Sequence, residues 1–178
     1  MNFLVISDIH GDACVERIFE HVKADAILCL GDLLYHGPRN PLPDNYNPQA
    51  VIALLNKHAH MIIAVRGNCD AEVDQMMLQF PLTADYNSLF LDRRRVFMSH
   101  GHLYGPAHLP LLEKGSIVLT GHTHIPTAEK KDGIWMCNPG SPSLPKGSHP
   151  KSYGILNHDG FTVFTMRDEV YMHVDFDD

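Results

Sequence analysis

Acidic, imidazole and amide side chains recur where apolar runs of the chain end. They fall in five segments, which are Asp8-Ile9-His10, Gly31-Asp32, Gly67-Asn68, His100-Gly101 and Gly121-His122-Thr123-His124. Each segment alone has an ordinary explanation, because aspartate and asparagine favour turns and short motifs often arise by chance. Two surface histidines, for example, would account for His122 and His124. The recurrence of such side chains after successive apolar runs instead favours a metal site at strand ends.

The types and number of these side chains indicate which ions would bind. Carboxylate and amide oxygens together with imidazole nitrogens form a hard-to-borderline set, which suits manganese, iron or zinc. Seven such side chains exceed what one ion needs if a position is to stay open for substrate. If one carboxylate bridges, they divide between two ions about 3.5–4 Å apart, a pair that can hold a bridging hydroxide and clamp an in-line phosphoryl displacement.

The first segments follow predicted strands that alternate with helices. Apolar runs predict buried strands at residues 2–7, 26–30 and 61–65. Between them, the spacing predicts helices at residues 13–23, with Asp12 as the N-cap, and at residues 47–58. Strands joined in this way run parallel with neighbouring carboxyl ends. Asp8, His10 and Asp32 should therefore share one edge of a sheet, beneath a loop formed by residues 33–46.

The second half of the chain is predicted to contain mainly hairpins and antiparallel strands. A short helix is predicted through Val73, Met76 and Met77, and another at residues 106–114. The remaining runs predict hairpins at 89–99 and 127–138, a buried strand at 117–119, and three antiparallel strands between residues 153 and 174. We therefore expect one α/β domain, residues 1–178, with two sheets, the first of them flanked by helices.

Composition narrows the class of protein. The formal net charge of −7 argues against nucleic acid or an anionic membrane as the main partner, although bound metal would still permit an anionic substrate. The four cysteines are scattered without a C-x-x-C pair, which predicts neither a zinc ribbon nor a disulfide framework. The apolar run Phe3-Leu4-Val5-Ile6 is too short for a signal or a membrane span, so we expect a reduced, cytoplasmic protein. Hydrophobic residues near 106–112 could form a homo-oligomer interface or pack in the core.

The five segments taken together resemble the calcineurin-like metallophosphoesterase superfamily, whose pattern is D-x-H, G-D, G-N-H-[DE], H and G-H-x-H. The likeness runs from Asp8 to His124. Two further stretches, residues 33–40 (LLYHGPRN) and 138–141 (NPGS), are similar to the small bacterial YfcE-type phosphodiesterase branch. The resemblance implies a four-layer α/β/β/α sandwich of two mixed sheets flanked by helices, which agrees with the two sheets expected from the patterning.

The resemblance also implies a role for each of the seven side chains. One divalent ion would be held by Asp8, His10 and His124, a second by Asn68, His100 and His122, with Asp32 bridging them. Manganese is the expected ion, with iron, zinc, nickel and magnesium as alternatives. The implied reaction is hydrolysis of a small phosphate ester, most readily a phosphodiester, by attack of a metal-bridging hydroxide on phosphorus.

One position departs from the superfamily pattern. Cys69 follows Asn68, where the superfamily usually has a histidine that helps to stabilise or protonate the leaving group. A thiol has an unperturbed pKa of ~8.5 and is a poorer donor than imidazolium, so substrates with good leaving groups should suffer less. The YfcE-like branch shares this cysteine. Cys69 is therefore predicted to be catalytic, together with Asn68 and His100, the alternative being a spectator thiol.

Four further residues are predicted to contact substrate, each with an alternative. His36 and Arg39 lie in the loop above the metal edge, and His102 could face either the phosphate or solvent. Arg66 could bind phosphate or only pair with Asp70. A different function also fits the fold, because the superfamily includes protein-binding scaffolds such as a retromer subunit. Such scaffolds tend to lose ligand histidines, whereas all seven ligand positions are filled here, and this favours an enzyme.

Overall fold

Residues 1–176, which the computed structural model describes, contain eleven strands and three α-helices. The strands are β1 (Phe3–Ile6), β2 (Ala26–Cys29), β3 (Ile62–Ala64), β4 (Tyr86–Leu91), β5 (Arg94–Ser99), β6 (Ile117–Leu119), β7 (Thr127–Lys131), β8 (Ile134–Asn138), β9 (Ser152–Leu156), β10 (Gly160–Thr165) and β11 (Val170–Asp175). The α-helices are α1 (Glu16–His21), α2 (Pro48–Lys57) and α3 (Glu72–Met77), with 3-10 turns at Ala13–Val15 and Ala59–Met61.

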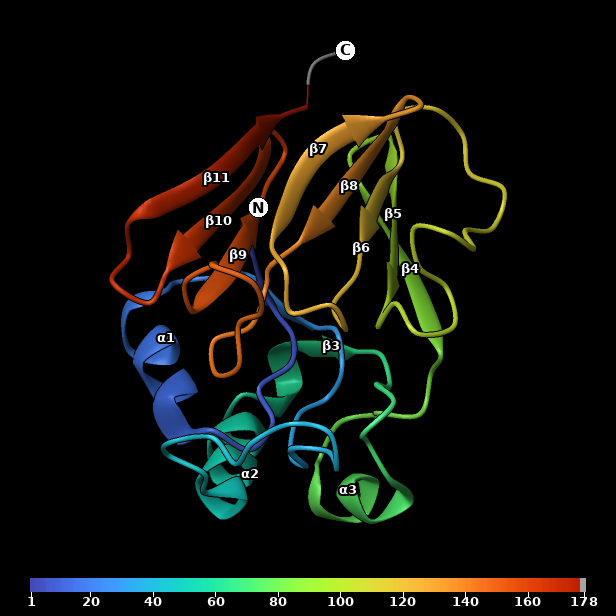
Figure 1. The fold of residues 1–178 in the computed structure, drawn as a ribbon. Helices are drawn as coiled ribbons and strands as arrows, with labels where there is room; N and C mark the ends of the chain where they lie inside the picture. Colours follow the sequence, from blue (N-terminus) through green and yellow to red (C-terminus); the bar gives the residue numbers. More distant parts are fainter. Residues whose placement is uncertain (177–178) are drawn as a thin grey trace.

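The strands form two mixed sheets that pack face to face (Figure 1). The first sheet has the order β11-β10-β9-β1-β2-β3, and the second has the order β4-β5-β6-β8-β7. In the first sheet β1, β2 and β3 are parallel, and in the second β5, β6 and β8 are parallel. The predicted α/β class with two mixed sheets flanked by helices is therefore confirmed.

The central strand β1 is buried on both faces, as its unbroken apolar sequence predicts. Leu4 and Ile6 belong to the core between the first sheet and helices α1 and α2. Phe3 and Val5 belong to the core between the two sheets. Because α1 and α2 connect parallel neighbours, the carboxyl ends of β1, β2 and β3 come together at one edge.

The helices start where the sequence predicts. Asp12 caps the first helical turn by accepting the Cys14 backbone N–H at 2.9 Å, and Asn47 caps α2 by accepting that of Ala50 at 3.1 Å. The helix predicted at residues 13–23 is divided, however, into the 3-10 turn and α1. Pro48 occupies the start of α2, where its fixed φ and missing N–H cost nothing.

The helix predicted at residues 106–114 is wrong, because this segment runs over the outer face of the second sheet without helical structure. Pro110 would fall inside that helix, where proline removes a hydrogen bond and clashes with the preceding turn. Leu109 and Leu112 pack on the outward-facing Phe97 of β5, which confirms core packing for these two. Leu111 is 97% exposed, and its contact with a second copy of the chain stays a prediction.

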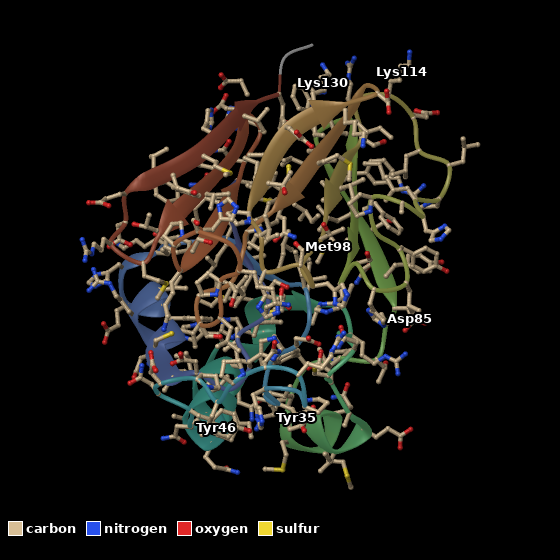
Figure 2. All side chains as sticks on the ribbon, in the orientation of Figure 1. Tyr35, Tyr46, Asp85, Met98, Lys114 and Lys130 are labelled. Carbon is tan, nitrogen blue, oxygen red and sulfur yellow. The ribbon has the colours of Figure 1, made fainter. Side chains whose placement is uncertain are left out.

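The carboxyl ends of β1, β2, β3, β5 and β6 open towards one region, on the side where the loop with Tyr35 and Tyr46 lies (Figure 2). Lys114 and Lys130 mark the opposite end of the molecule (Figure 2). Among residues 1–176, no helix has the length and apolar character needed to cross a membrane.

Candidate metal centre

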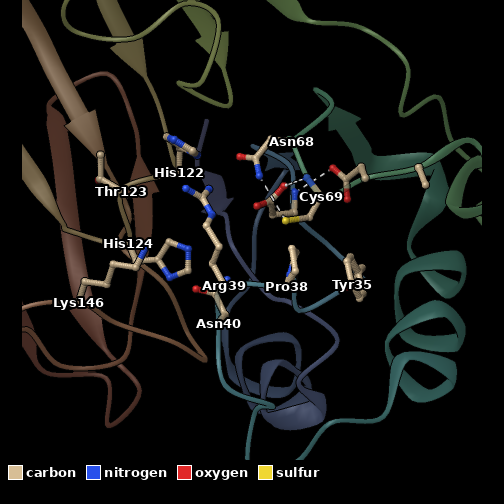
Figure 3. Close-up of a pocket in the computed structure, with 14 residues that line it drawn as sticks. Tyr35, Pro38, Arg39, Asn40, Asn68, Cys69, His122, Thr123, His124 and Lys146 are labelled. Carbon is tan, nitrogen blue, oxygen red and sulfur yellow. Dashed lines mark hydrogen bonds between the residues drawn. The ribbon is translucent and has the colours of Figure 1, made fainter.

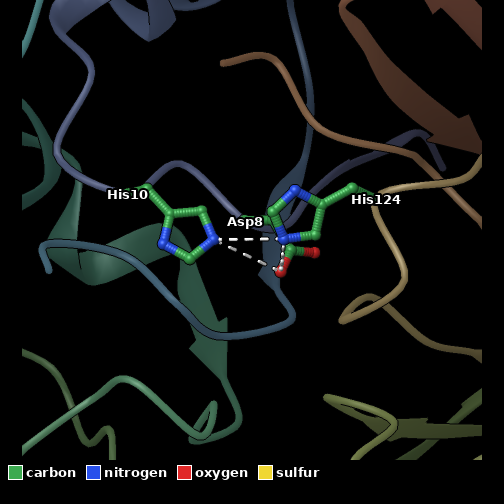
Figure 4. Close-up of side chains that lie close together, drawn as sticks. All are labelled: Asp8, His10 and His124. Carbon is green, nitrogen blue, oxygen red and sulfur yellow. Dashed lines mark hydrogen bonds and ion pairs between the residues drawn. The ribbon is translucent and has the colours of Figure 1, made fainter. Parts of the chain in front are cut away.

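Two histidine rings from distant parts of the chain meet at Asp8. His10, in the loop after β1, and His124, in the loop after β6, bring their Nε2 atoms to 3.2 Å from each other (Figure 4). Asp8 Oδ1 lies 3.8 Å from the His10 nitrogen and 3.3 Å from the His124 nitrogen. All three side chains are buried, so water does not solvate this group of polar atoms from outside.

Each of these rings is oriented by a backbone carbonyl behind it. His10 Nδ1 lies 2.8 Å from the Tyr35 carbonyl oxygen, and His124 Nδ1 lies 2.5 Å from that of Leu144. A carbonyl only accepts, so each Nδ1 donates its proton, and in the neutral rings both Nε2 atoms present lone pairs. Two facing lone pairs cannot hydrogen-bond to each other. A cation between them resolves this conflict, and rings anchored in this way are typical of metal ligands.

The Asp8 carboxylate leaves one oxygen for the same region. Its Oδ2 accepts hydrogen bonds from the Ser7 hydroxyl at 2.7 Å and from the His122 backbone N–H at 2.9 Å. Its Oδ1 is buried and has no hydrogen-bond partner in the described part of the chain. Burial would raise the pKa of Asp8, but His124 and His100 outweigh it and lower that pKa. An ionised oxygen beside two imidazole lone pairs is a donor set that fits a divalent cation.

Asp32, in the loop after β2, lies between the two sides of the centre. Its Oδ2 is 3.8 Å from His10 Nε2 and 3.4 Å from His100 Nε2, while its Oδ1 accepts the Cys69 backbone N–H at 2.8 Å. Burial acts to raise the pKa of Asp32, but its hydrogen bond and charge interaction with His100 prevail and hold that pKa well below its usual range. One oxygen within reach of two histidines from different strands has the placement that a bridging ligand requires.

The other side of the centre is built on His100 and Asn68. His100 Nδ1 donates to the Leu30 carbonyl at 2.8 Å, and its Nε2 lies 3.1 Å from Asn68 Oδ1. Burial alone would lower the pKa of His100, but Asp32 and Asp8 raise it to about 9. In the metal-free protein this ring therefore holds a proton at neutral pH, which any ion bound there would displace.

His122 lies at the margin of this arrangement. Its ring centroid is 5.1 Å from that of His100 and 6.2 Å from that of His102. It is half-buried, and burial followed by the nearby His100 lowers its pKa. Among residues 1–176, the groups of three His, Cys or Asp donor atoms within 4.8 Å of one another do not include it. The structure thus brings six of the seven predicted ligands close together, with His122 beside them.

The backbone at these residues adopts an unusual conformation. Five predicted ligands have positive φ, namely Asp8 (56°), His10 (51°), Asp32 (56°), His122 (67°) and His124 (58°). Elsewhere in the described chain, positive φ at residues other than glycine occurs at Asp92, Asp132 and Asp168, which lie in hairpin turns. Strained residues tend to gather where function requires it, so the conformation itself marks this edge of the molecule.

Two glycines allow the loops to approach so closely. A Cβ atom on Gly121 would lie 1.8 Å from Ser7 Oγ, and one on Gly67 would lie 2.1 Å from Asp32 Oδ1. Any larger residue at either position would push apart the strand ends that carry the candidate ligands.

The end of β8 and the loop after it, residues 138–144, support the centre from behind, and the sequence alone did not predict this. The Ser141 and Ser143 hydroxyls donate to the Asp8 carbonyl at 2.8 and 3.2 Å. Asn138 Nδ2 donates to the Gly121 carbonyl at 3.0 Å. The only signal in the sequence was the likeness of residues 138–141 to a family motif, which gave them no role.

Asp70 is a second supporting residue that the sequence did not predict. Its carboxylate accepts the backbone N–H groups of Asp32, Leu33 and Gly67 at 2.7–2.9 Å. It therefore joins the loop after β2 to the loop after β3. Burial raises the pKa of Asp70 to about 6, although the three N–H donors favour the ionised form.

A cavity of about 790 Å³ opens beside the centre (Figure 3). Among the predicted residues, five line this cavity, namely Asp32, Asn68, Cys69, His122 and His124. Arg39 enters from the loop above, which agrees with its predicted place near a substrate. Lys146, which the sequence did not single out, lines the same cavity beside His124 (Figure 3).

The other predicted substrate residues lie outside the lining of this cavity. Arg66 bonds Asp85 at 2.8 Å, so its ion-pair partner in the structure is Asp85 and not Asp70. His36 packs edge-on against Tyr35 and Tyr46, with ring centroids 4.8 and 5.4 Å away. His102 is closer to the chemistry, since its ring lies 5.3 Å from that of His100.

Comparison with known proteins identifies the family. The profile described as the calcineurin-like phosphoesterase superfamily domain matches residues 1–160. The chain belongs to this superfamily. The predicted class, a metal-dependent phosphoesterase, is thereby confirmed.

Individual members of the superfamily are similar over nearly the whole chain. Phosphodiesterase YfcE of Escherichia coli K12 is 47% identical over 173 residues, covering 95% of this chain and 94% of that protein. The probable metallophosphoesterase YsnB of Bacillus subtilis is 31% identical, covering 92% and 89%. The solved structure of the E. coli phosphoesterase YfcE superposes with a TM-score of 0.96 at 45% identity, covering 99% of this chain and all of that one.

More distant solved structures share the fold alone. A structure of Vps29 from Entamoeba histolytica in complex with zinc has a TM-score of 0.60 at 21% identity, covering 99% of this chain and all of that one.

Proposed function

We propose that this protein is a dinuclear phosphodiesterase that prefers manganese and acts on small phosphodiesters. The observation that carries the proposal is the convergence of Asp8 Oδ1, which is buried without a hydrogen-bond partner in the described chain, with the Nε2 atoms of His10 and His124. The similarity to E. coli phosphodiesterase YfcE over 95% of the chain supports the choice of a diester.

In this proposal the candidate ligands divide into two sets. The first half of the centre, Asp8, His10 and His124, holds one ion. The second half, Asn68, His100 and His122, holds the other, and Asp32 is shared between them. When bound, the ions supply activation of a water nucleophile and neutralisation of charge on the phosphate.

The remaining residues act on the substrate. Arg39 and Lys146 place positive charge in the cavity, where they would attract and orient the anionic diester. Cys69 lines the same cavity. Burial, together with Asp32, raises its pKa to about 12, so it is a neutral thiol that can donate only weakly to a leaving group. This favours substrates whose leaving groups need little protonation.

The proposal also includes the cellular compartment in which the protein works. The four cysteines of the described chain are free, which fits a reducing compartment, and we propose the cytoplasm.

The direct test is hydrolysis of bis-p-nitrophenyl phosphate with manganese, after chelation, and after manganese is restored. We expect activity that is lost on chelation and recovered with manganese, and two ions per chain by elemental analysis. Activity that is independent of metal, or no activity at two bound ions, would contradict the proposal and leave a protein-binding scaffold as the better account.

The shared carboxylate provides the sharpest variant. Asp32→Asn removes a charge that both ions would use, so activity should fall by more than about 100-fold and the metal content should drop below two. Asp92→Asn is the matched control, because Asp92 also has positive φ, 54°, but lies in the β4–β5 turn. Two tightly bound ions and full rate in Asp32→Asn would show that the bridge is misassigned.

A further inference from the structure

Cys69 is close enough to the centre to be part of it. Its Sγ, a ring nitrogen of His10 and a carboxylate oxygen of Asp32 lie within 4.8 Å of one another. Metal–sulfur bonds of about 2.3 Å and metal–nitrogen or metal–oxygen bonds of about 2.0–2.2 Å span such separations with small side-chain movements. Sulfur, nitrogen and oxygen thus form a third donor group that overlaps the two halves already described.

Cys69 is held by one backbone hydrogen bond and one hydrogen bond to its sulfur. The Cys69 backbone N–H donates to Asp32 Oδ1 at 2.8 Å, and Asn68 Nδ2 donates to Sγ at 3.3 Å. A Cβ atom on Gly37 would lie 2.9 Å from Sγ, so the absence of a side chain there leaves room beside the thiol. The sulfur therefore faces the cavity, where an entering ion meets it.

Ligand softness separates this group from the rest of the centre. The seven candidate ligands offer only oxygen and nitrogen, which suit manganese and magnesium as well as other ions. A thiolate selects for softer ions, such as zinc, cobalt and cadmium, and binds manganese poorly. The same centre can hence treat hard and soft ions differently.

We infer that Cys69 is an additional metal donor, which with His10 and Asp32 holds soft divalent ions at the cavity wall. Binding converts the thiol to a thiolate, and the proton is released to solvent. Because His10 and Asp32 are also ligands of the proposed manganese centre, a soft ion bound there displaces manganese, and soft ions therefore inhibit the manganese-loaded enzyme. The inference rests on the proposed metal centre, but its readout is spectroscopic and does not require activity.

Cobalt absorption tests the sulfur bond directly. Cobalt added to the metal-free full chain should give a sulfur-to-cobalt charge-transfer band in the near ultraviolet, and Cys69→Ser should abolish it. Cys14→Ser is the matched control, because Cys14 is the other partly exposed thiol, and this variant should retain the band. A band that survives in Cys69→Ser, or no band in the unmodified chain, would overturn the inference.

Inhibition gives a second readout. The cadmium concentration that halves the activity of the manganese-loaded enzyme should rise by about tenfold or more in Cys69→Ser, as expected when a ligand is lost, while the manganese requirement changes much less. Equal sensitivity of the two proteins to cadmium would contradict the inference.

If Cys69→Ser fails to fold, a measurement on the unmodified chain still tests the inference. Cadmium should protect Cys69 of the unmodified chain from alkylation by iodoacetamide, read by peptide mass spectrometry, and manganese should protect it much less. Equal protection by both ions would count against a sulfur bond. Failure of manganese-dependent hydrolysis would instead overturn the proposed function, and the cobalt band would still report on Cys69.

Discussion

The two halves of the centre differ in how firmly they are built. In the first half, Asp8, His10 and His124 are all buried, and both rings are anchored by backbone carbonyls. In the second half only His100 is buried and anchored, while Asn68 is exposed and His122 is half-buried. The first half is pre-organised, and the second lies at the cavity, where its side chains can adjust to a ligand.

The protonation of the two halves differs as well. Burial lowers the pKa of His10, so this ring is neutral and ready to bind metal at neutral pH. The pKa of His100 is raised to about 9, since the carboxylates of Asp32 and Asp8 outweigh its burial. If the centre holds two ions as proposed, this asymmetry predicts that the ion in the second half exchanges more readily than the ion in the first.

Loss of a ligand should separate the halves most clearly. His124→Gln removes one of two facing lone pairs in the pre-organised half, so we expect loss of both ions and a fall in activity of more than about 100-fold. His122→Gln should keep the first ion and lose affinity for the second. Metal content by elemental analysis, measured beside activity, distinguishes these outcomes, and equal metal content in the two variants would remove the distinction between the halves.

The pH dependence of metal binding should differ between the halves. An ion in the second half must displace the His100 proton, so its affinity should rise by about tenfold per pH unit between pH 7 and 9 and then level off. The first ion should show little dependence there, because the lowered pKa values of Asp8 and His10 leave no proton to displace. Calorimetric titration at several pH values measures this. Parallel slopes for both ions would contradict it.

Loss of a residue that supports the first half from behind should reduce metal affinity less than loss of a ligand. Ser141→Ala removes the hydroxyl that donates to the Asp8 carbonyl and accepts the Leu144 N–H at 2.8 Å, so the carbonyl that anchors His124 also loses its fixed position. Manganese affinity should fall by about tenfold. Ser88→Ala, on strand β4, is the matched control and should leave affinity unchanged.

The smallest effect concerns the leaving group. Cys69→His restores the residue usual in the superfamily and supplies a better proton donor. Turnover should increase severalfold for alkyl diesters, and much less for nitrophenyl diesters, whose leaving groups need no proton. The ratio of the two rates is the measurement, and an unchanged ratio would make Cys69 a spectator in hydrolysis.

The sequence predicted the parts of the site that depend on local order. Apolar strands that end just before Asp8, Asp32, Asn68, His100 or His122 place these residues at the carboxyl ends of parallel strands in the two sheets. The packing of one sheet on the other then brings these ends together. Ser141 and Asp70 could not be predicted, because their roles lie in hydrogen bonds to loops more than 30 residues away. Lys146 could not be predicted either, because nothing in its local sequence distinguishes it from a surface lysine.

The errors have equally local causes. Leu109 and Leu112 have helical spacing, yet Pro110 between them prevents a helix, and the sheet beneath provides the apolar surface that they cover. For Arg66, Asp70 was the nearer carboxylate in the sequence, whereas the fold directs Asp70 to three backbone N–H groups and leaves Asp85 for the arginine.

The place of β1 in the first sheet sets when the centre can form during synthesis. β1 lies between β2 and β9, so the strand that leads into Asp8 has one of its neighbours more than 140 residues downstream. The hydroxyls of Ser141 and Ser143, which fix the Asp8 backbone, also emerge late from the ribosome. Such long-range pairing is slow to form. A nascent chain can present every candidate ligand up to His124 and still lack the framework that holds them, so we expect metal capture to follow completion of the sheet.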